Sequence, residues 1–190
     1  HVFVVDATVG GTPRQVTSGN FSHSAPSWSA DGKSMFVSGI RKPDAEYLKG
    51  DSEVYKLDLA TGTFTALTDR NGPDGNPEVS PDGRWIAYTG FDQQQFTSHL
   101  SSLHLMDTTG GRKRLWVGKL PSSPSNIVWA PDSSGVYYAM QESGEENIYF
   151  APADIGMAPR KITTGNHVLS GVSFARNGQT AAVRSSVRQP

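Results

Sequence analysis

The sequence predicts an all-β fold built from a repeat, and two observations support this prediction. A tight turn followed at once by a strand occurs four times, with its turn residue at Asp31, Asp82, Asp132 and Asn177. These residues are 51, 50 and 45 positions apart. A period of roughly 45–50 residues is typical of repeat folds. Apolar patterns with the period of a helix do not persist anywhere in the chain.

The clearest copy of the motif is the turn at residues 80–83, which leads directly into the strand at 85–88. Pro81 presets φ for the first corner, Asp82 can bond its own backbone, and Gly83 adopts a positive φ without a Cβ penalty. Three positions before each turn residue stands a bulky apolar side chain: Trp28, Val79, Trp129 and Phe174. We expect the aromatic ones to pack between repeats rather than to bind a ligand.

Each repeat continues into a further pair of strands. Residues 53–58 turn at 61–62 into 64–68, and residues 103–107 turn at 110–111 into 114–116. Polar and apolar residues alternate over 55–58, as in a strand with one covered face. Four antiparallel strands that repeat at this period predict the blade of a β-propeller.

The repeat register divides residues 1–190 into blades. Three complete blades cover about 24–68, 76–116 and 125–163, and half blades cover 1–19 and 168–190. About four blades could close a small ring, with the two half blades completing one blade. Blades of this length are usual in rings of six to eight, so we expect an arc of a larger ring. Two arcs could also pair, because an unpaired blade edge is a template for self-association.

Composition excludes several classes of function. A net charge of -1 gives no basic excess for nucleic acid, and the absence of Cys excludes disulfides and thiolate chemistry. No apolar run is long enough to span a membrane. We therefore expect a soluble protein of the cytoplasm or the periplasm. Because His1 stands inside a repeat, we also expect the native polypeptide to extend beyond this end.

Several motifs together resemble the propeller domain of the prolyl oligopeptidase family of serine peptidases, in its acylaminoacyl-peptidase and dipeptidyl-peptidase branches. They are the turn at 58–62, the Leu-Thr-Asp run at 67–69, Trp-Ala-Pro-Asp at 129–132, and the segments 160–166 and 185–190. The resemblance covers nearly the whole chain. The turn motif alone is shared with the propeller of the Tol system.

The resemblance implies a two-domain enzyme, in which an α/β-hydrolase domain carries Ser, Asp and His and the propeller restricts entry to short peptides. This chain lacks the Gly-x-Ser-x-Gly motif, because Ser173 follows Gly171 but precedes Phe174 and Ala175. We therefore expect no catalytic residue here. The predicted function is a non-catalytic domain that gates and selects peptide substrates for a hydrolase domain of the same polypeptide.

Two other functions fit the same pattern. One is a protein-interaction propeller of the Tol periplasmic type, without enzymatic activity. The other is a self-contained four-bladed binding protein. The first predicts a longer chain with no hydrolase domain, and the second predicts a stable monomer with close termini.

Candidates for substrate binding lie in the connections between strands. The link at 39–52 is the richest in chemistry and contains Arg41, Asp44 and Glu46. His23 and His167 both stand in connections from one repeat to the next, so they can share one face of the ring. A structural role in these loops is the competing interpretation for both histidines.

No metal site or cofactor is predicted. His99 and His104 are five residues apart, which places them on opposite faces of a strand. Asp31, Asp82 and Asp132 each stand alone in a turn, without the alternating oxygen ligands of a calcium loop. The acidic pair Glu145-Glu146 fits a solvated turn.

Overall fold

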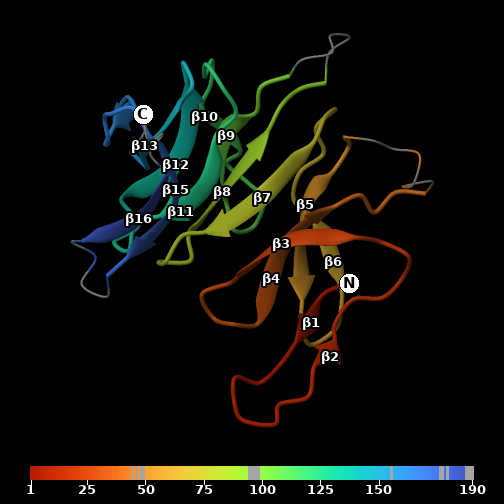
Figure 1. Cartoon of the computed structure of the whole chain (residues 1–190). Helices are drawn as coiled ribbons and strands as arrows, with labels where there is room; N and C mark the ends of the chain where they lie inside the picture. The colour runs from red at the N-terminus through yellow and green to blue at the C-terminus, as the bar shows by residue number, and fades with distance from the viewer. Residues whose placement is uncertain are drawn as a thin grey trace.

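The computed structural model describes residues 1–43, 45, 47, 50–93, 99–154, 156–175, 178 and 180–186. This part of the chain is all β, with sixteen strands (Figure 1). Asn177, one of the four predicted turn residues, lies outside the described residues, as does the end of the segment 185–190.

The strands form antiparallel sheets in chain order. A short hairpin comes first, formed by β1 (Phe3–Val4) and β2 (Arg14–Gln15). The first four-stranded sheet has the order β3 (His23–Trp28), β4 (Ser34–Gly39), β5 (Glu53–Asp58) and β6 (Phe64–Ala66). The second has the order β7 (Asp74–Val79), β8 (Trp85–Gly90), β9 (Ser102–Asp107) and β10 (Arg114–Val117).

The third sheet contains β11 (Ser125–Trp129), β12 (Gly135–Glu142), β13 (Glu145–Pro152) and β14 (Arg160–Lys161). A last hairpin, β15 (Val168–Phe174) and β16 (Ala181–Ser186), joins this sheet through one parallel residue pair, Glu146 with Val168. The joining bond is 2.9 Å long, from the Glu146 amide to the His167 carbonyl. The last hairpin therefore starts beside the end of the third sheet.

The predicted turn chemistry is visible in the motif at residues 80–83. The Asp82 carboxylate accepts hydrogen bonds from the Ser80 hydroxyl at 2.6 Å and from the Arg84 amide at 3.1 Å. Gly83 has a φ of 71°, which explains the glycine at this position. The Asp31 carboxylate is bonded in the same way by Ser29 and Lys33. The carboxylates of these turns hold their own backbone in place.

The core consists of apolar clusters between consecutive sheets. Phe36 and Val54 of the first sheet pack with Ile86, Tyr88 and Met106 of the second. A larger cluster joins the second sheet to the third and contains Leu103, Leu105, Val117, Trp129, Val136 and Tyr138. Each sheet is therefore stabilised mainly by its neighbours in the chain, as expected of stacked repeats.

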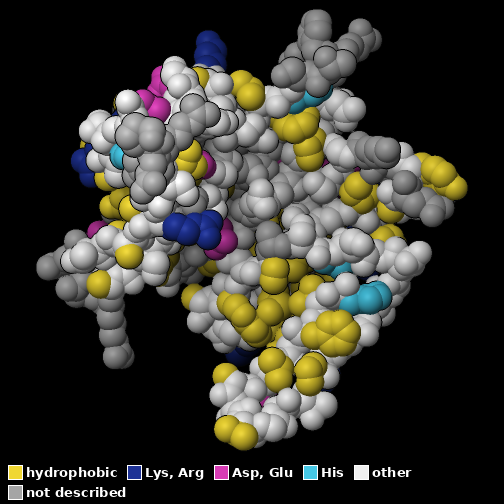
Figure 2. All heavy atoms as spheres, viewed as in Figure 1, with side chains coloured by type: hydrophobic (Ala, Val, Ile, Leu, Met, Phe, Trp, Pro, Cys, Tyr) yellow, Lys and Arg dark blue, Asp and Glu magenta, His cyan; other side chains and the backbone are white. Residues whose placement is uncertain are grey.

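The aromatic residues before the turns differ in their surroundings. Trp129 is buried, and its indole nitrogen donates to the Glu78 carbonyl of the preceding sheet at 2.8 Å. The Phe174 ring lies 4.9 Å from that of Tyr137. The expectation that Trp28 packs in the same way is wrong, because its side chain is 48% exposed. Only the short strands β1 and β2 precede it, and Figure 2 shows an apolar surface over this region.

Three threonines join the last strand of a blade to its third strand. Each hydroxyl accepts an amide hydrogen from the third strand or from the residue just before it, at 2.8–3.0 Å: Thr17 with Val2, Thr68 with Val54 and Thr163 with Ile148. The Thr68 hydroxyl also donates to Glu53 at 2.7 Å, and that of Thr163 donates to Asn147 at 3.0 Å. We call this arrangement the threonine latch. In the second sheet, Gly118 follows β10 at the corresponding place.

Replacing Thr68 with valine should lower the free energy of unfolding by about 2 kcal/mol, because the buried Val54 amide loses its acceptor and Glu53 loses a donor. Urea unfolding measures this loss. Thr65→Val is the matched control, since Thr65 lies exposed in β6 and should change stability by less than about 0.5 kcal/mol. Equal losses in the two variants would contradict the latch.

Candidate functional site: a polar cluster on the loop face

The candidate residues gather at one end of the sheets. Strands β4, β8 and β12 end there, β5, β9 and β13 begin there, and the connections between sheets cross it (Figure 1). We call this end the loop face, formed by the described residues of 18–23, 40–52, 67–74, 91–101, 118–124, 143–144 and 162–167. Connections gathered on one rigid end of a scaffold are the usual place for binding residues.

Arg70 is the centre of the most buried charged group on this face. Its Nε lies 3.0 Å from Asp74 Oδ1, and its Nη1 donates to Asp92 Oδ1 at 3.2 Å. Its Nη2 lies 3.0 Å from His104 Nδ1. The Asp74 side chain is only 1% exposed, at the start of β7. Arg70 lies in the connection between the first and the second sheet. Its guanidinium therefore holds this connection to β7, to β9 and to the link between β8 and β9.

Burial sets the protonation of this group. It raises the pKa of Asp74 to about 6, although the Arg70 charge acts in the opposite direction. Burial, with the Arg70 charge, lowers the pKa of His104 to about 4. His104 is therefore neutral at pH 7, accepts from Arg70 through Nδ1, and carries its hydrogen on Nε2. The Tyr88 ring stacks on His104 at 5.1 Å, and burial raises the pKa of Tyr88 to about 12.

The charged group continues into the first sheet through Glu53. This buried carboxylate accepts from Thr68, and Lys42 Nζ lies 3.8 Å from its other oxygen. Lys42 also pairs with Asp51. Burial raises the pKa of Glu53, while the bond from Thr68 lowers it. The Ser52 hydroxyl donates to the Asp74 carbonyl at 3.0 Å. This bond joins the Glu53 part of the charged group to the Arg70 part.

Two adjoining cavities of about 340 Å³ each open beside this cluster. Both are lined by Arg70, Asp92, His104 and Leu115. Among the described residues, no three His, Asp or Glu side chains are placed to hold a metal ion. The two aspartates balance the arginine charge. This arrangement can position a ligand or fix a blade, but it does not supply a nucleophile with its base.

His23 and Arg41 form a second group at the start of β3. Arg41 Nη1 lies 3.0 Å from His23 Nε2. The Arg41 guanidinium carbon lies 3.7 Å from the centre of the Phe64 ring and 4.5 Å from that of Phe21. Burial and the Arg41 charge lower the pKa of His23 to about 4. The predicted residues Asp44 and Glu46 of the same link lie outside the described residues.

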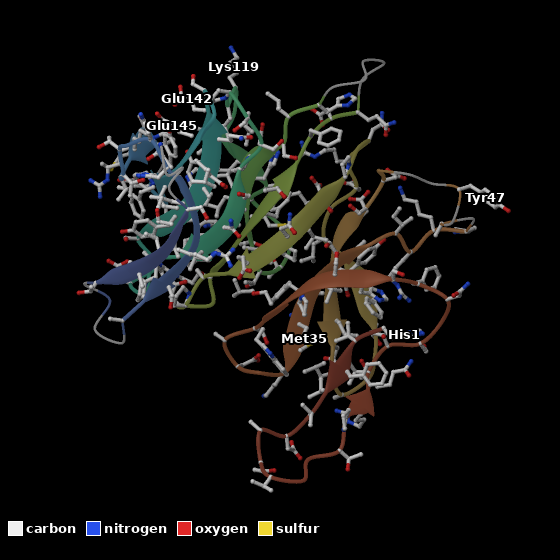
Figure 3. The ribbon with its side chains drawn as sticks, viewed as in Figure 1. His1, Met35, Tyr47, Lys119, Glu142 and Glu145 are labelled. Carbon is white, nitrogen blue, oxygen red and sulfur yellow. The ribbon has the colours of Figure 1, made fainter. Side chains whose placement is uncertain are left out.

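His167 lies in a different group. Its Nε2 is 3.0 Å from Asn147 Oδ1, next to the latch of Thr163. It lines a cavity of about 700 Å³ with Ser143, Gly144, Glu145, Asn166, Val168 and Ser186. Figure 3 shows Glu145 of this cavity on the opposite side of the view from Tyr47, which belongs to the same link as Arg41. The structure therefore brings His23 to Arg41 but not to His167.

The Arg70 cluster was missed by the sequence analysis, although the repeat contained a signal for it. Asp74 pairs with Gly90 in the second sheet, as His23 pairs with Gly39 in the first. Aligning the repeats would have shown an ionisable residue at the first position of the first strand in two blades, His23 in β3 and Asp74 in β7. Such a position faces the connection from the preceding blade, where Arg70 stands.

Known proteins are similar to this chain in sequence and in fold. Dipeptidyl-peptidase 5 of Porphyromonas gingivalis is 30% identical over 166 residues, which are 86% of this chain and 24% of that protein. TolB from Acinetobacter baumannii superposes with a TM-score of 0.67 and 22% identity, over 94% of this chain and 41% of its own. The chain has the fold of a β-propeller.

A third protein superposes on a slightly larger share of this chain. The puromycin-hydrolysing peptidase of Mycobacterium tuberculosis superposes with a TM-score of 0.71 and 16% identity, over 97% of this chain and 35% of its own. The resemblance of this propeller to those of the prolyl oligopeptidase family is confirmed by dipeptidyl-peptidase 5, and the puromycin-hydrolysing peptidase shares its fold. No family model matches the chain.

The propeller spans about a quarter of the length of dipeptidyl-peptidase 5, with which it shares the most sequence among the three. The described residues contain no helix long and apolar enough to cross a membrane.

Proposed function

We propose that this propeller is the non-catalytic domain of a prolyl-oligopeptidase-type serine peptidase, and that an α/β-hydrolase domain of the same polypeptide carries the chemistry. The observation that supports this function is the similarity to dipeptidyl-peptidase 5 over 86% of the chain. In this proposal residues 1–19 and 168–190 are half blades of a larger ring, and the three complete blades lie between them.

The propeller would act by steric selection. A ring of rigid blades admits a short unfolded peptide and excludes a folded domain, and its closure over a hydrolase removes water from the reacting bond. The loop face is the end of the blades that carries buried charge, and we assign substrate contacts to it. His23, Arg41, Asp44, Glu46 and His167 are the proposed contacts, with Arg70 and Asp74 holding the connection between the first two complete blades.

A protein-interaction propeller of the TolB type is the second candidate, and the superposition on TolB favours it. The two functions differ in what the propeller acts with. A peptidase requires a hydrolase domain in the native polypeptide, whereas an interaction propeller requires a binding partner and no reactive serine.

Open strand edges suggest a further partner. In the described part of the chain, β1 pairs only with β2, and β16 pairs only with β15. We propose that these edges pair with blades elsewhere in the native polypeptide, and that the isolated chain self-associates through them.

One experiment separates the two candidate functions. Native extract is labelled with a fluorophosphonate probe for active serine hydrolases and then blotted with an antibody against this chain. The peptidase predicts one band, much larger than 190 residues, that carries the probe. A band without the probe would reject the peptidase and favour the interaction propeller.

A further inference from the structure

Two arginines occupy related positions on the loop face, and their surroundings differ. Arg70 contacts Asp74, the first residue of β7, and Arg41 contacts His23, the first residue of β3. Asp74 and His23 have the same register in their sheets, opposite Gly90 and Gly39. The Arg70 guanidinium is neutralised by two carboxylates. Among the described residues, no carboxylate lies within ion-pair distance of Arg41.

The neighbours of Arg41 fix its position without balancing its charge. The Phe64 and Phe21 rings contact the guanidinium, and His23 accepts one of its hydrogens while remaining neutral at pH 7. Partial burial lowers the pKa of Arg41, so the charge is partly desolvated. Because His23 accepts through Nε2, its hydrogen lies on Nδ1, which is buried and has no acceptor in the described part of the chain.

A guanidinium presents five donors in a planar fork that matches a carboxylate. One of these donors is occupied by His23. Contacts with aromatic rings orient the group but accept no hydrogen bond from its edge. This arrangement therefore has donors and positive charge in excess of its acceptors, which is what an anion-binding site requires.

We propose that Arg41, held by Phe21, His23 and Phe64, binds a carboxylate of a peptide ligand. This inference rests on the proposed function for the peptide, and on the unbalanced guanidinium for the carboxylate. The carboxylate comes either from the carboxyl terminus or from an acidic side chain of the peptide. Arg70 is excluded from this role because its charge is already paired with the carboxylates of Asp74 and Asp92.

The test measures binding and does not depend on catalysis. The native full-length protein is treated with a small phosphonylating inhibitor, and fluorescence anisotropy follows two tetra-alanine peptides labelled at their amino termini. One ends in a free carboxylate and the other in a carboxamide. A third labelled peptide has an internal Asp and an amidated end. We expect the carboxylate or the Asp peptide to bind at least about tenfold more tightly than the neutral one.

Arg41→Gln should remove this preference, so that the acidic and the neutral peptides bind with equal affinity. Arg41→Lys keeps the charge but not the fork, and should retain only part of the preference. Arg14→Gln is the matched control, because Arg14 is exposed in β2 and the variant has the same net charge as Arg41→Gln. Asp44→Gln with Glu46→Gln tests whether the neighbouring acids occupy the fork. The site predicts that the preference for the acidic peptides over the neutral one persists in this double variant.

Three outcomes would overturn the site: equal affinity of the wild-type protein for all three peptides, an unchanged preference in Arg41→Gln, or a preference that appears only in the double acid variant. Fluorophosphonate labelling of a parallel sample reports on the proposed function separately. A protein that is unlabelled but prefers the acidic peptides would lose the peptidase assignment and keep the Arg41 site. A labelled protein without that preference would lose the site alone.

Discussion

Replacing Arg70 with methionine should lower the free energy of unfolding by about 3 kcal/mol at pH 7. The variant leaves the Asp74 carboxyl, which is 1% exposed, without a cation, and it leaves His104 Nδ1 without a donor. Removing one member of a buried ion pair is costly because the other charge stays desolvated. Asp74 can escape part of this cost by taking up a proton, since its pKa is already raised to about 6.

The double variant Arg70→Met, Asp74→Asn tests this cause directly. It removes the unpaired charge, so we expect it to recover most of the stability that the single variant loses. Urea unfolding at pH 7 measures all variants. Arg84→Met is the control, because Arg84 pairs with Asp82 at the surface and is 75% exposed. A double variant as unstable as the single one would show that the charge of Asp74 is not responsible.

Replacing His104 with phenylalanine should make the protein less sensitive to acid. The pKa of His104 falls from 6.5 to about 4 on folding, so the unfolded chain binds the proton more readily. The stability that this difference provides is complete above pH 6.5 and is lost as the pH falls towards 4. The loss amounts to about 3 kcal/mol for a shift of this size.

The variant should therefore be less stable than the wild type at pH 8, where it lacks the bond to Arg70, and more stable at pH 5. His104→Gln keeps an acceptor for Arg70 but cannot take up the proton, so its profile should be equally flat with a smaller loss at pH 8. Asp74 works in the opposite direction, because its raised pKa favours the folded state at low pH. Parallel profiles for wild type and variant between pH 8 and 5 would contradict the assignment.

The fold could be predicted from the sequence because its signals are local. In three of the turns an Asp is followed by a residue with a positive φ, which is Gly32, Gly83 or Ser133. The strands show their own apolar pattern, so the blade order follows from the period. The surroundings of Trp28 could not be predicted in this way. Its burial depends on which blade precedes β3, and the repeat motif contains no information about that neighbour.

The candidate site was predicted only in part, for a related reason. Arg41 and His23 belong to the same blade, and the strand order alone places both on the loop face. Arg70 and His104 are 34 residues apart and meet only because the connection from the first sheet crosses the second. In the sequence these residues look like ordinary surface charges, and burial gives them their altered pKa values.

The threonine latch has a consequence for how this chain acquires its structure. Each latch closes a loop of 14 or 15 residues between the hydroxyl and the amide that it accepts. Closing such short loops costs little entropy, and hairpins of this size form on the microsecond scale. We expect the hairpins that the latches close, each formed by the third and the fourth strand of a blade, to form early and independently. The interfaces between sheets should form later. Folding then proceeds blade by blade. The chain can therefore fold along the same pathway during synthesis on the ribosome and during refolding from urea.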